Sequence, residues 1–210
     1  MKGPFTDLSR LQRHKLFDLL GVHIYRFNKN DEVLPTIKNE NIVGIVTEGC
    51  AQIFYMEYNG NELVLETLYE NSVFGTSISG TNNDNIQIVA KEFTEIVVID
   101  YNKLLNPSNL KHRYFNIFLT NLFDIINVKF KKTNERLRIL EKKQIRDKLL
   151  DFFEGQYKKN HSKIIYLPYS LKDLADFLAV NRSAMFRELK RLKDDRVIDI
   201  TDKRITLLNK

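Results

Sequence analysis

The sequence predicts an α+β fold with a β-rich N-terminal domain, a long central helix and a small C-terminal helical domain. Between residues 22 and 100, short runs rich in β-branched and aromatic residues alternate with Asn, Gly and Asp, which is typical of a β-sandwich or barrel. After residue 110, apolar residues recur every three or four positions, as along a helix that buries one face. The chain has 210 residues, enough for one large domain or two small ones.

The composition is that of a globular protein and excludes several functional classes. Of the residues, 43% are hydrophobic and 29% are charged, so a disordered or fibrous chain is not expected. The single cysteine, Cys50, rules out an internal disulfide and a cluster held by four cysteines of this chain. The four histidines are far apart and form no HxH or HxxxH pattern. We therefore expect no metal site. No cofactor is predicted either, and the chain is not expected to be an enzyme.

The sequence also argues against a membrane or secreted location. It contains no run of about 18 apolar residues, so neither a transmembrane helix nor a membrane partner is expected. Residues 1–13 lack an apolar core followed by small residues, so we expect no signal peptide and a cytoplasmic protein.

The net charge of +6 is distributed unevenly along the chain. Residues 1–110 carry 9 Lys and Arg against 14 Asp and Glu, a net charge of −5, whereas residues 111–210 carry 24 against 13, a net charge of +11. An acidic half joined to a basic half suggests two tasks, with a polyanion bound by the basic half. A basic helix surface that is only solvated would have the same charge.

The N-terminal half is expected to contain one helix and a series of strands. Residues 5–20 carry apolar side chains at loose helical spacing, and Gly21 is a typical residue to end a helix. Asn59 and Gly60 supply the two positive-φ positions of a type I′ hairpin turn. The expected strands are the runs 42–46, 51–56, 62–69, 86–91 and 95–99.

A helical pattern extends from residue 110 to about residue 157. Its apolar stripe favours a dimer helix over residues 110–141, although a helix packed on its own sandwich would show the same stripe. A second helix is expected over residues 143–157, a polar linker over residues 155–162, and a short strand over residues 164–167. The stripe consists of Phe115, Phe118, Leu119, Leu122, Ile125 and Ile126 and, after a weak stretch, Leu137, Ile139 and Leu140.

Residues 168–193 predict two short helices joined by a tight turn. Ser170 precedes the first helix with Asp173 three residues later, a variant of the capping box, and Asn181 is a good N-cap for the second helix. The expected inward residues are Leu171, Leu174, Ala175 and Leu178, followed by Met185, Phe186, Leu189 and Leu192. The residues left for the outer surface of the second helix are Arg182, Ser183, Arg187, Lys190, Arg191 and Lys193.

This arrangement is a helix-turn-helix, which places its second helix in the major groove of DNA. Arginines there can bond O6 and N7 of guanine as a fork, and the helix N-terminus favours a phosphate. A hairpin of residues 197–208 follows as a wing, with Lys203 and Arg204 at its tip. An αα-hairpin with a solvated basic face is the alternative. The candidate DNA-binding residues are Ser170, Asn181, Arg182, Ser183, Arg187, Lys190 and Lys203.

The order of these elements resembles the Crp/Fnr family of bacterial transcription regulators over nearly the whole chain. Residues 45–49 look like the family's I-V-x-x-G strand and turn, and residues 71–75 look like its approach to the ligand site, with Asn71 in place of the usual Gly. The resemblance implies a β-roll of the jelly-roll, cyclic-nucleotide-binding type over residues 1–109, a dimerisation helix over 110–141 and a winged helix-turn-helix over 142–210.

The resemblance also implies a function. It predicts a homodimeric regulator that binds a pseudo-palindromic site in double-stranded DNA, with RNA polymerase as a further candidate partner. Arg182 and Arg187 stand where family members commonly contact DNA. Ser183 replaces the Glu that many members use to read cytosine, so a different operator is expected.

The expected effector pocket, at Gly75, Thr76 and Ser77, departs from the cyclic-nucleotide members of the family. Those members have Glu-Leu after the Gly, where this chain has Thr76 and Ser77. No Lys or Arg lies between Gly80 and Lys91 to pair with a cyclic phosphate, and a buried phosphate without a cation is costly. We therefore expect either an effector other than cyclic AMP or cyclic GMP, or a domain that has lost sensing.

Two other classes of protein have similar patterns. A metal-dependent cupin enzyme needs clustered His and Glu ligands, and His23 is the single histidine between residues 22 and 100. A partner-binding module whose basic half does not read DNA would retain the fold but not the DNA affinity. Haem ligation by Cys50, His23 or His112 is a further alternative that no sequence pattern favours.

Overall fold

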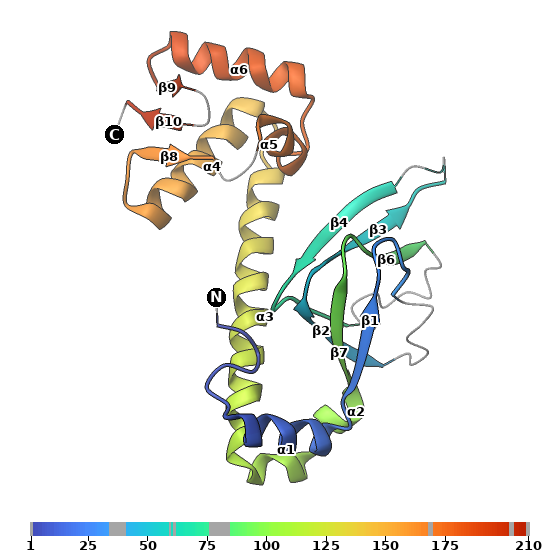
Figure 1. Cartoon of the computed structure of the whole chain (residues 1–210). Helices are drawn as coiled ribbons and strands as arrows, with labels where there is room; N and C mark the ends of the chain where they lie inside the picture. The colour runs from blue at the N-terminus through green and yellow to red at the C-terminus, as the bar shows by residue number, and fades with distance from the viewer. Residues whose placement is uncertain are drawn as a thin grey trace. The chain divides into compact units, whose positions relative to one another are not determined.

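The computed structural model describes residues 2–33, 41–58, 60, 62–75, 85–167, 170–201 and 204–208 (Figure 1). The chain forms two compact units, Met1–Val128 and Lys129–Lys210. Their boundary lies inside helix α3 (Arg113–Leu140), so the segment expected as a separate dimerisation helix is shared between the units.

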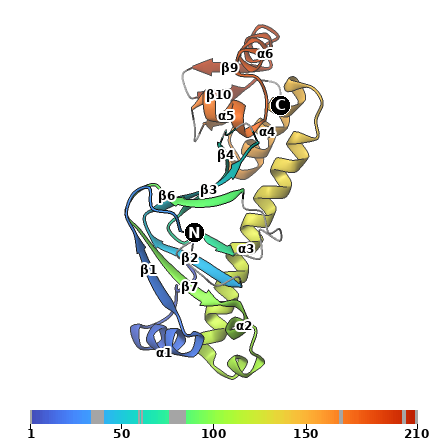
Figure 2. The same ribbon diagram turned by 90° about the vertical axis from the view of Figure 1, so that its right-hand side faces the viewer.

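The N-terminal unit contains two antiparallel sheets, which Figure 2 shows as two layers. The expected strands are all present, and two short ones, β1 and β5, were not singled out by the sequence. The first sheet has the order β1 (His23–Phe27), β7 (Thr94–Asp100), β2 (Ile42–Glu48) and β5 (Val73–Gly75). The second has the order β4 (Glu62–Tyr69), β3 (Cys50–Met56) and β6 (Ile86–Ala90).

Alternation along the strands builds the layers of this unit. On β2, Ile42 and Val46 point into the core between the two sheets, together with Ala51 and Leu68 of the second sheet. Ile45 of β2 points to the opposite face, which the helices cover. The first sheet is therefore buried on both faces, which confirms the predicted β-roll.

The N-terminal helix, α1 (Arg10–Leu20), begins later than expected. Ser9 accepts a hydrogen bond from the amide of Gln12 in a complete capping box, which starts the helix at Arg10. The predicted start at residue 5 is therefore wrong, whereas the end is confirmed, because Gly21 adopts the left-handed conformation with φ 57°. Two short helices, α2 (Tyr101–Leu104) and the 3₁₀ helix η2 (Pro107–Lys111), then precede α3.

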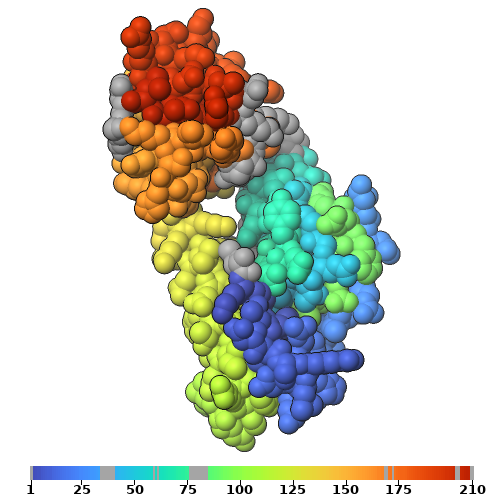
Figure 3. Space-filling model, turned by 60° about the vertical axis from the view of Figure 1, so that its left-hand side comes forward, coloured from blue at the N-terminus to red at the C-terminus, as the bar shows by residue number. Residues whose placement is uncertain are grey.

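The segment before α1 is an arm that packs on the first half of α3. In Figure 3 the arm is dark blue and lies against the yellow-green helix. Phe5 stacks on Phe118 with ring centroids 5.6 Å apart. The buried Asn121 side chain donates to the carbonyl oxygens of Pro4 and Thr6, at 3.3 and 2.8 Å. Apolar stacking and these two hydrogen bonds together hold the arm on the helix.

The C-terminal unit is built from helices α4 (Ile145–Asn160), α5 (Leu171–Phe177) and α6 (Arg182–Asp194) and a three-stranded sheet. The sheet has the order β8 (Ile164–Tyr166), β10 (Arg204–Leu207) and β9 (Ile198–Thr201), so the predicted wing hairpin gains a third strand. The predicted linker at residues 155–162 is wrong, because α4 continues to Asn160, with Tyr157 against the core and Glu154 paired to Lys158.

Among the described residues, no helix has both the length and the apolar character needed to cross a membrane.

The turn between β2 and β3 gives a stability prediction. Gly49 has φ 82°, and a Cβ added there would lie 2.0 Å from the carbonyl oxygen of Phe93. Gly60 has φ 81°, but within the described part of the chain no atom beyond its own neighbours lies within 4 Å of such a Cβ. We expect Gly49→Ala to lower the free energy of unfolding by at least about 3 kcal/mol. Gly60→Ala, the control, should lose about 1 kcal/mol from backbone strain alone.

Urea denaturation followed by circular dichroism measures both losses. Equal losses for the two variants would show that the turn moves away from the backbone of Phe93 at no cost, contrary to this packing.

Candidate nucleic-acid interface

The turn between α5 and α6 is formed by local capping. Ser170 and Asp173 form a complete capping box at the start of α5, as predicted. At the turn, Ala179 adopts a positive φ of 48°, and the side chain of Asn181 then accepts from the amide of Ala184 to begin α6. The short helices are therefore determined largely by their own end residues.

Two cations from neighbouring helices hold the C-terminal end of α5. Arg136 Nε of α3 donates to the carbonyl of Phe177 at 3.2 Å, and its guanidinium lies 5.3 Å from the centroid of the Phe177 ring. Lys148 Nζ of α4 donates to the carbonyl of Leu178 at 3.0 Å. Positive charge at a helix C-terminus is favourable because it satisfies the free carbonyls and the helix dipole.

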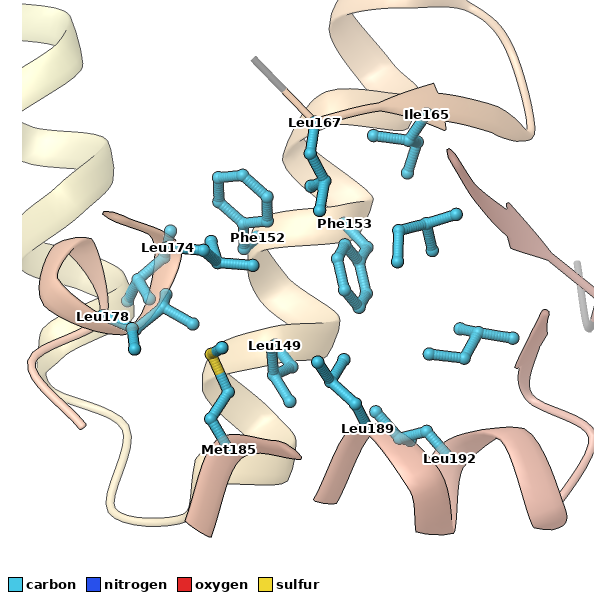
Figure 4. Packing of buried hydrophobic residues seen from close by; sticks show 14 of the residues in the cluster. Leu149, Phe152, Phe153, Ile165, Leu167, Leu174, Leu178, Met185, Leu189 and Leu192 are labelled. Atoms are coloured by element: carbon cyan, nitrogen blue, oxygen red, sulfur yellow. The ribbon is translucent and has the colours of Figure 1, made fainter. Parts of the chain in front are cut away.

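An apolar core seats α6 on α4. Figure 4 shows Met185, Leu189 and Leu192 of α6 pointing toward Leu149 and Phe153 of α4. All five side chains are buried. Because the α6 residues recur at spacings of four and three, this face of the helix is fully used by the core.

The structure corrects one of the predicted core residues. Phe186 was expected inside, but its side chain is 40% exposed. It follows Met185 by one position, and a helix turns by about 100° per residue, so Phe186 lies off the buried row. The spacing of Met185, Leu189 and Leu192 already contained this signal, because those three residues complete the row without Phe186.

The outer surface of α6 contains both paired and unpaired cations. Arg191 lies 3.4 Å from a carboxylate oxygen of Glu188, and Lys193 Nζ lies 3.1 Å from Asp199 Oδ1 of β9. Arg187 and Lys190 are exposed and have no ion-pair partner among the described residues. The charges free to meet a phosphate or a guanine are therefore those on the first two-thirds of the helix.

The polar candidates at the helix starts are partly committed to capping. Ser183 Oγ donates to Asn181 Oδ1 at 2.6 Å, so the hydroxyl oxygen retains only its acceptor capacity for another group. Ser170 Oγ donates to Asp173 Oδ2 at 2.8 Å, which places a carboxylate beside it. The roles of Ser170, Asn181 and Ser183 at DNA stay predictions.

The wing lies next to α6 in sequence and is tied to it by Lys193. This residue also donates to the carbonyl of Ile200 at 3.3 Å. Its hydrogen bond to Asp199, followed by the backbone hydrogen bond of Ile200, lowers the pKa of the Asp199 carboxyl. Arg204 is exposed at the start of β10, whereas Lys203, predicted at the tip, lies outside the described residues.

Arg146 of α4 fixes α6 by an ion-pair network. Its guanidinium lies 2.8 Å from Asp195 Oδ2 and 3.3 Å from Glu188 Oε1. The hydrogen bond to Asp195 is the main cause that raises the pKa of Arg146, and the hydrogen bond to Glu188 adds to it. Burial has a smaller effect in the opposite direction. No local sequence pattern marks this residue, because its partners Glu188 and Asp195 lie 42 and 49 positions further along the chain.

The predicted effector pocket is only partly within the described structure. Gly75 ends β5 and pairs with Val43 of β2, whereas Thr76 and Ser77 lie outside the described residues. Asn71 has φ 69°, a left-handed conformation that explains why Gly is usual there in the family and why Asn is tolerated. Burial is the main cause that raises the pKa of the Cys50 thiol, followed by the charge of Glu92.

No group of three or more His, Cys, Asp or Glu side chains in the described part of the chain is arranged to hold a metal ion.

Helix α3 has a second apolar face besides the one buried in its own unit. Phe115, Phe118, Leu122 and Ile125 are buried against the first sheet and α1. A different row along the same helix stays exposed among the described residues. The exposed row is Phe123, Ile126, Phe130 and Leu137, with exposed fractions of 56%, 44%, 63% and 52%. The predicted single stripe is thus two stripes: the buried one confirms packing of the helix on its own unit. The dimer interpretation stays a prediction.

The fold combines a β-roll unit with a second unit that is a winged helix-turn-helix. Residues 137–210 match the family described as the Crp-like helix-turn-helix domain. Residues 137–210 thus form a Crp-like helix-turn-helix domain, and the chain is a DNA-binding transcriptional regulator.

Two solved structures and one curated protein are similar to this chain at low sequence identity. CprK complexed with OCPA is 20% identical with a TM-score of 0.66, over 93% of this chain and 91% of that one. A CooA variant from Carboxydothermus hydrogenoformans is 18% identical with a TM-score of 0.60, over 98% of this chain and 94% of that one. The protein ycf28 of Porphyra purpurea, named as an HTH-type transcriptional regulator, is 20% identical over 88% of this chain and 77% of its own length.

The network around Arg146 gives a prediction for the seating of α6. Arg146→Ala leaves Glu188, whose side chain is only 13% exposed, without its partner on α4. We expect the free energy of unfolding of the C-terminal unit to fall by about 1–3 kcal/mol. Arg191→Ala removes a partner of the same Glu188 from a guanidinium that is 73% exposed, and should cost less than about 0.5 kcal/mol.

Thermal unfolding of both variants followed by circular dichroism makes the comparison. The network would not be what seats α6 if both substitutions had the same small effect.

Proposed function

We propose that this protein is a homodimer that binds a pseudo-palindromic DNA site through two copies of α6. The observation that carries the proposal is the polarity of α6: its apolar row is buried, and Arg182, Arg187 and Lys190 are exposed on the remaining surface. In a dimer, two such helices would enter successive major grooves about 34 Å apart. In this proposal the protein acts by binding DNA and catalyses no reaction. It works in the cytoplasm, and RNA polymerase is a second partner at the promoter.

Within each half-site, Arg187 is the strongest candidate for a base contact. It lies in the second turn of α6, opposite the buried row, and no carboxylate among the described residues neutralises it. A guanidinium can donate two parallel hydrogen bonds to O6 and N7 of guanine. Ser183, on the same outer line one turn earlier, can accept a hydrogen bond from the amino group of cytosine or adenine.

The DNA proposal is tested by a binding selection followed by two substitutions of the same kind. Purified protein is mixed with fragmented host DNA near physiological salt, and a two-fold-symmetric motif should be enriched. On that motif, Arg187→Ala should lower the ratio of specific to non-specific affinity about 10-fold to 100-fold. Arg191→Ala removes the same charge from a position paired with Glu188, so it should leave the ratio of specific to non-specific affinity unchanged.

Two outcomes would contradict the DNA proposal. One is weak, sequence-independent binding in the presence and in the absence of a metabolite extract from the host. The other is an affinity that does not change with salt concentration, because each phosphate contact should steepen the log–log salt dependence by about 0.9.

The exposed row on α3 supports the homodimer. Phe123, Ile126, Phe130 and Leu137 follow the alternating three- and four-residue spacing of a coiled-coil seam, with Thr133 at the intervening position. A large aromatic side chain gains about 1.5–3 kcal/mol when it is buried. A second copy of the same helix is the partner whose pattern matches this row residue by residue.

The dimer is tested with neighbouring truncations on α3. Phe130→Ala should weaken self-association at least about tenfold, because both copies lose a buried ring at the seam. Lys131→Ala, one position further round the helix and off the seam, should leave self-association unchanged. Sedimentation equilibrium at micromolar concentrations measures both constants. A wild-type monomer, or equal effects of the two substitutions, would contradict the proposed seam.

We also propose that any effector is not a cyclic nucleotide. The support is the sequence between Gly80 and Lys91, which offers no cation for a cyclic phosphate. An effector of another kind would shift the dimer between states with different DNA affinity only if it binds those states unequally. The selection with and without metabolite extract detects such an effector as a change in specific binding.

A further inference from the structure

Phe186 is an exposed aromatic side chain on an otherwise charged surface of α6. The core beneath the helix is complete without it, because Met185, Leu189 and Leu192 already fill the buried row. Phe186 is nevertheless large and 40% exposed. An aromatic ring that stays partly in water does not gain the stabilisation that burial would give. A bound partner that covers the Phe186 ring would supply this stabilisation.

The Phe186 ring lies in line with two cations along one flank of α6. Residues four apart on a helix are neighbours, so Phe186 lies between Arg182 before it and Lys190 after it. The guanidinium carbon of Arg182 is 5.6 Å from the ring centroid, a cation–π contact. If these two cations contact DNA in the major groove, the Phe186 ring between them lies in the same groove.

The major groove offers a single apolar feature to such a ring. Three of the four bases present only hydrogen-bonding groups and ring carbons there, whereas thymine adds a C5-methyl group. Phosphates and base amides are poor partners for an aromatic side chain, because contact with it would remove their water without replacing the hydrogen bonds.

We propose that Phe186 is a specificity-determining residue that contacts the C5-methyl group of one thymine in each half-site. The inference rests on the proposed function, since it requires α6 to lie in the major groove. It predicts that the operator contains an invariant thymine beside the base pair or phosphate that Arg182 contacts. Sequence recognition then combines hydrogen bonds from Arg187 with an apolar contact from Phe186.

Replacing thymine by deoxyuridine tests the contact directly, because it removes the methyl group and leaves base pairing intact. The operator from the selection is synthesised with deoxyuridine at each thymine in turn. For the wild-type protein, one position per half-site should lose affinity about fourfold, and both positions together about fifteenfold. Phe186→Ala should be insensitive to that replacement, whereas Phe186→Leu, which keeps an apolar side chain, should retain part of the sensitivity.

Phe186→Ala is expected to fold, because the buried row of α6 is unchanged, and circular dichroism checks this. The inference is overturned if wild-type protein binds every deoxyuridine operator as tightly as the thymine operator. It is also overturned if Phe186→Ala weakens binding but keeps the same deoxyuridine sensitivity, since the ring would then act only by orienting Arg182.

The same experiment separates this inference from the proposed function. If no symmetric motif is enriched, the proposed DNA recognition itself fails, and the role of Phe186 fails with it. If the motif is enriched and Arg187→Ala lowers specificity but no thymine is sensitive to deoxyuridine, the proposed function stands and only the role of Phe186 is wrong.

Discussion

The burial of one row of side chains on α6 is the constraint on which the nucleic-acid interface depends. Met185, Leu189 and Leu192 pack against α4, and this fixes the rotation of the helix about its own axis. Once that rotation is set, Ser183, Arg187 and Lys190 can only point outward. The chemistry of the interface is thus a consequence of hydrophobic packing on the opposite side of the same helix.

Electrostatic pairing then selects among the outward cations. Arg191 and Lys193 are held by Glu188 and Asp199, so their charges are partly satisfied within the unit. Arg187 has no such partner among the described residues and keeps its full capacity for a polyanion. A count of basic residues does not distinguish these side chains. The structure distinguishes cations that form ion pairs within the C-terminal unit from cations that are available to a ligand.

Helix α3 has two separate apolar surfaces. One row packs on the first sheet through Phe118 and Leu122, and another row with Phe123 and Phe130 stays exposed. Its last turns contribute Ile139 to the core of the C-terminal unit and Arg136 to the end of α5. The same helix therefore contributes buried side chains to both compact units of the chain.

The local features of this protein follow from short-range patterns in its sequence. The helix starts at Ser170 and Asn181 and the helix end at Gly21 depend on a few adjacent residues, so short-range patterns predicted them correctly. The tertiary structure decided what depends on distant partners: Phe5 packs on α3 rather than joining α1, and α4 continues through the expected linker. The exposure of Phe186 and the ion pairs of Arg146 with α6 also depend on tertiary structure. Burial and ion pairing are set by which helices pack together.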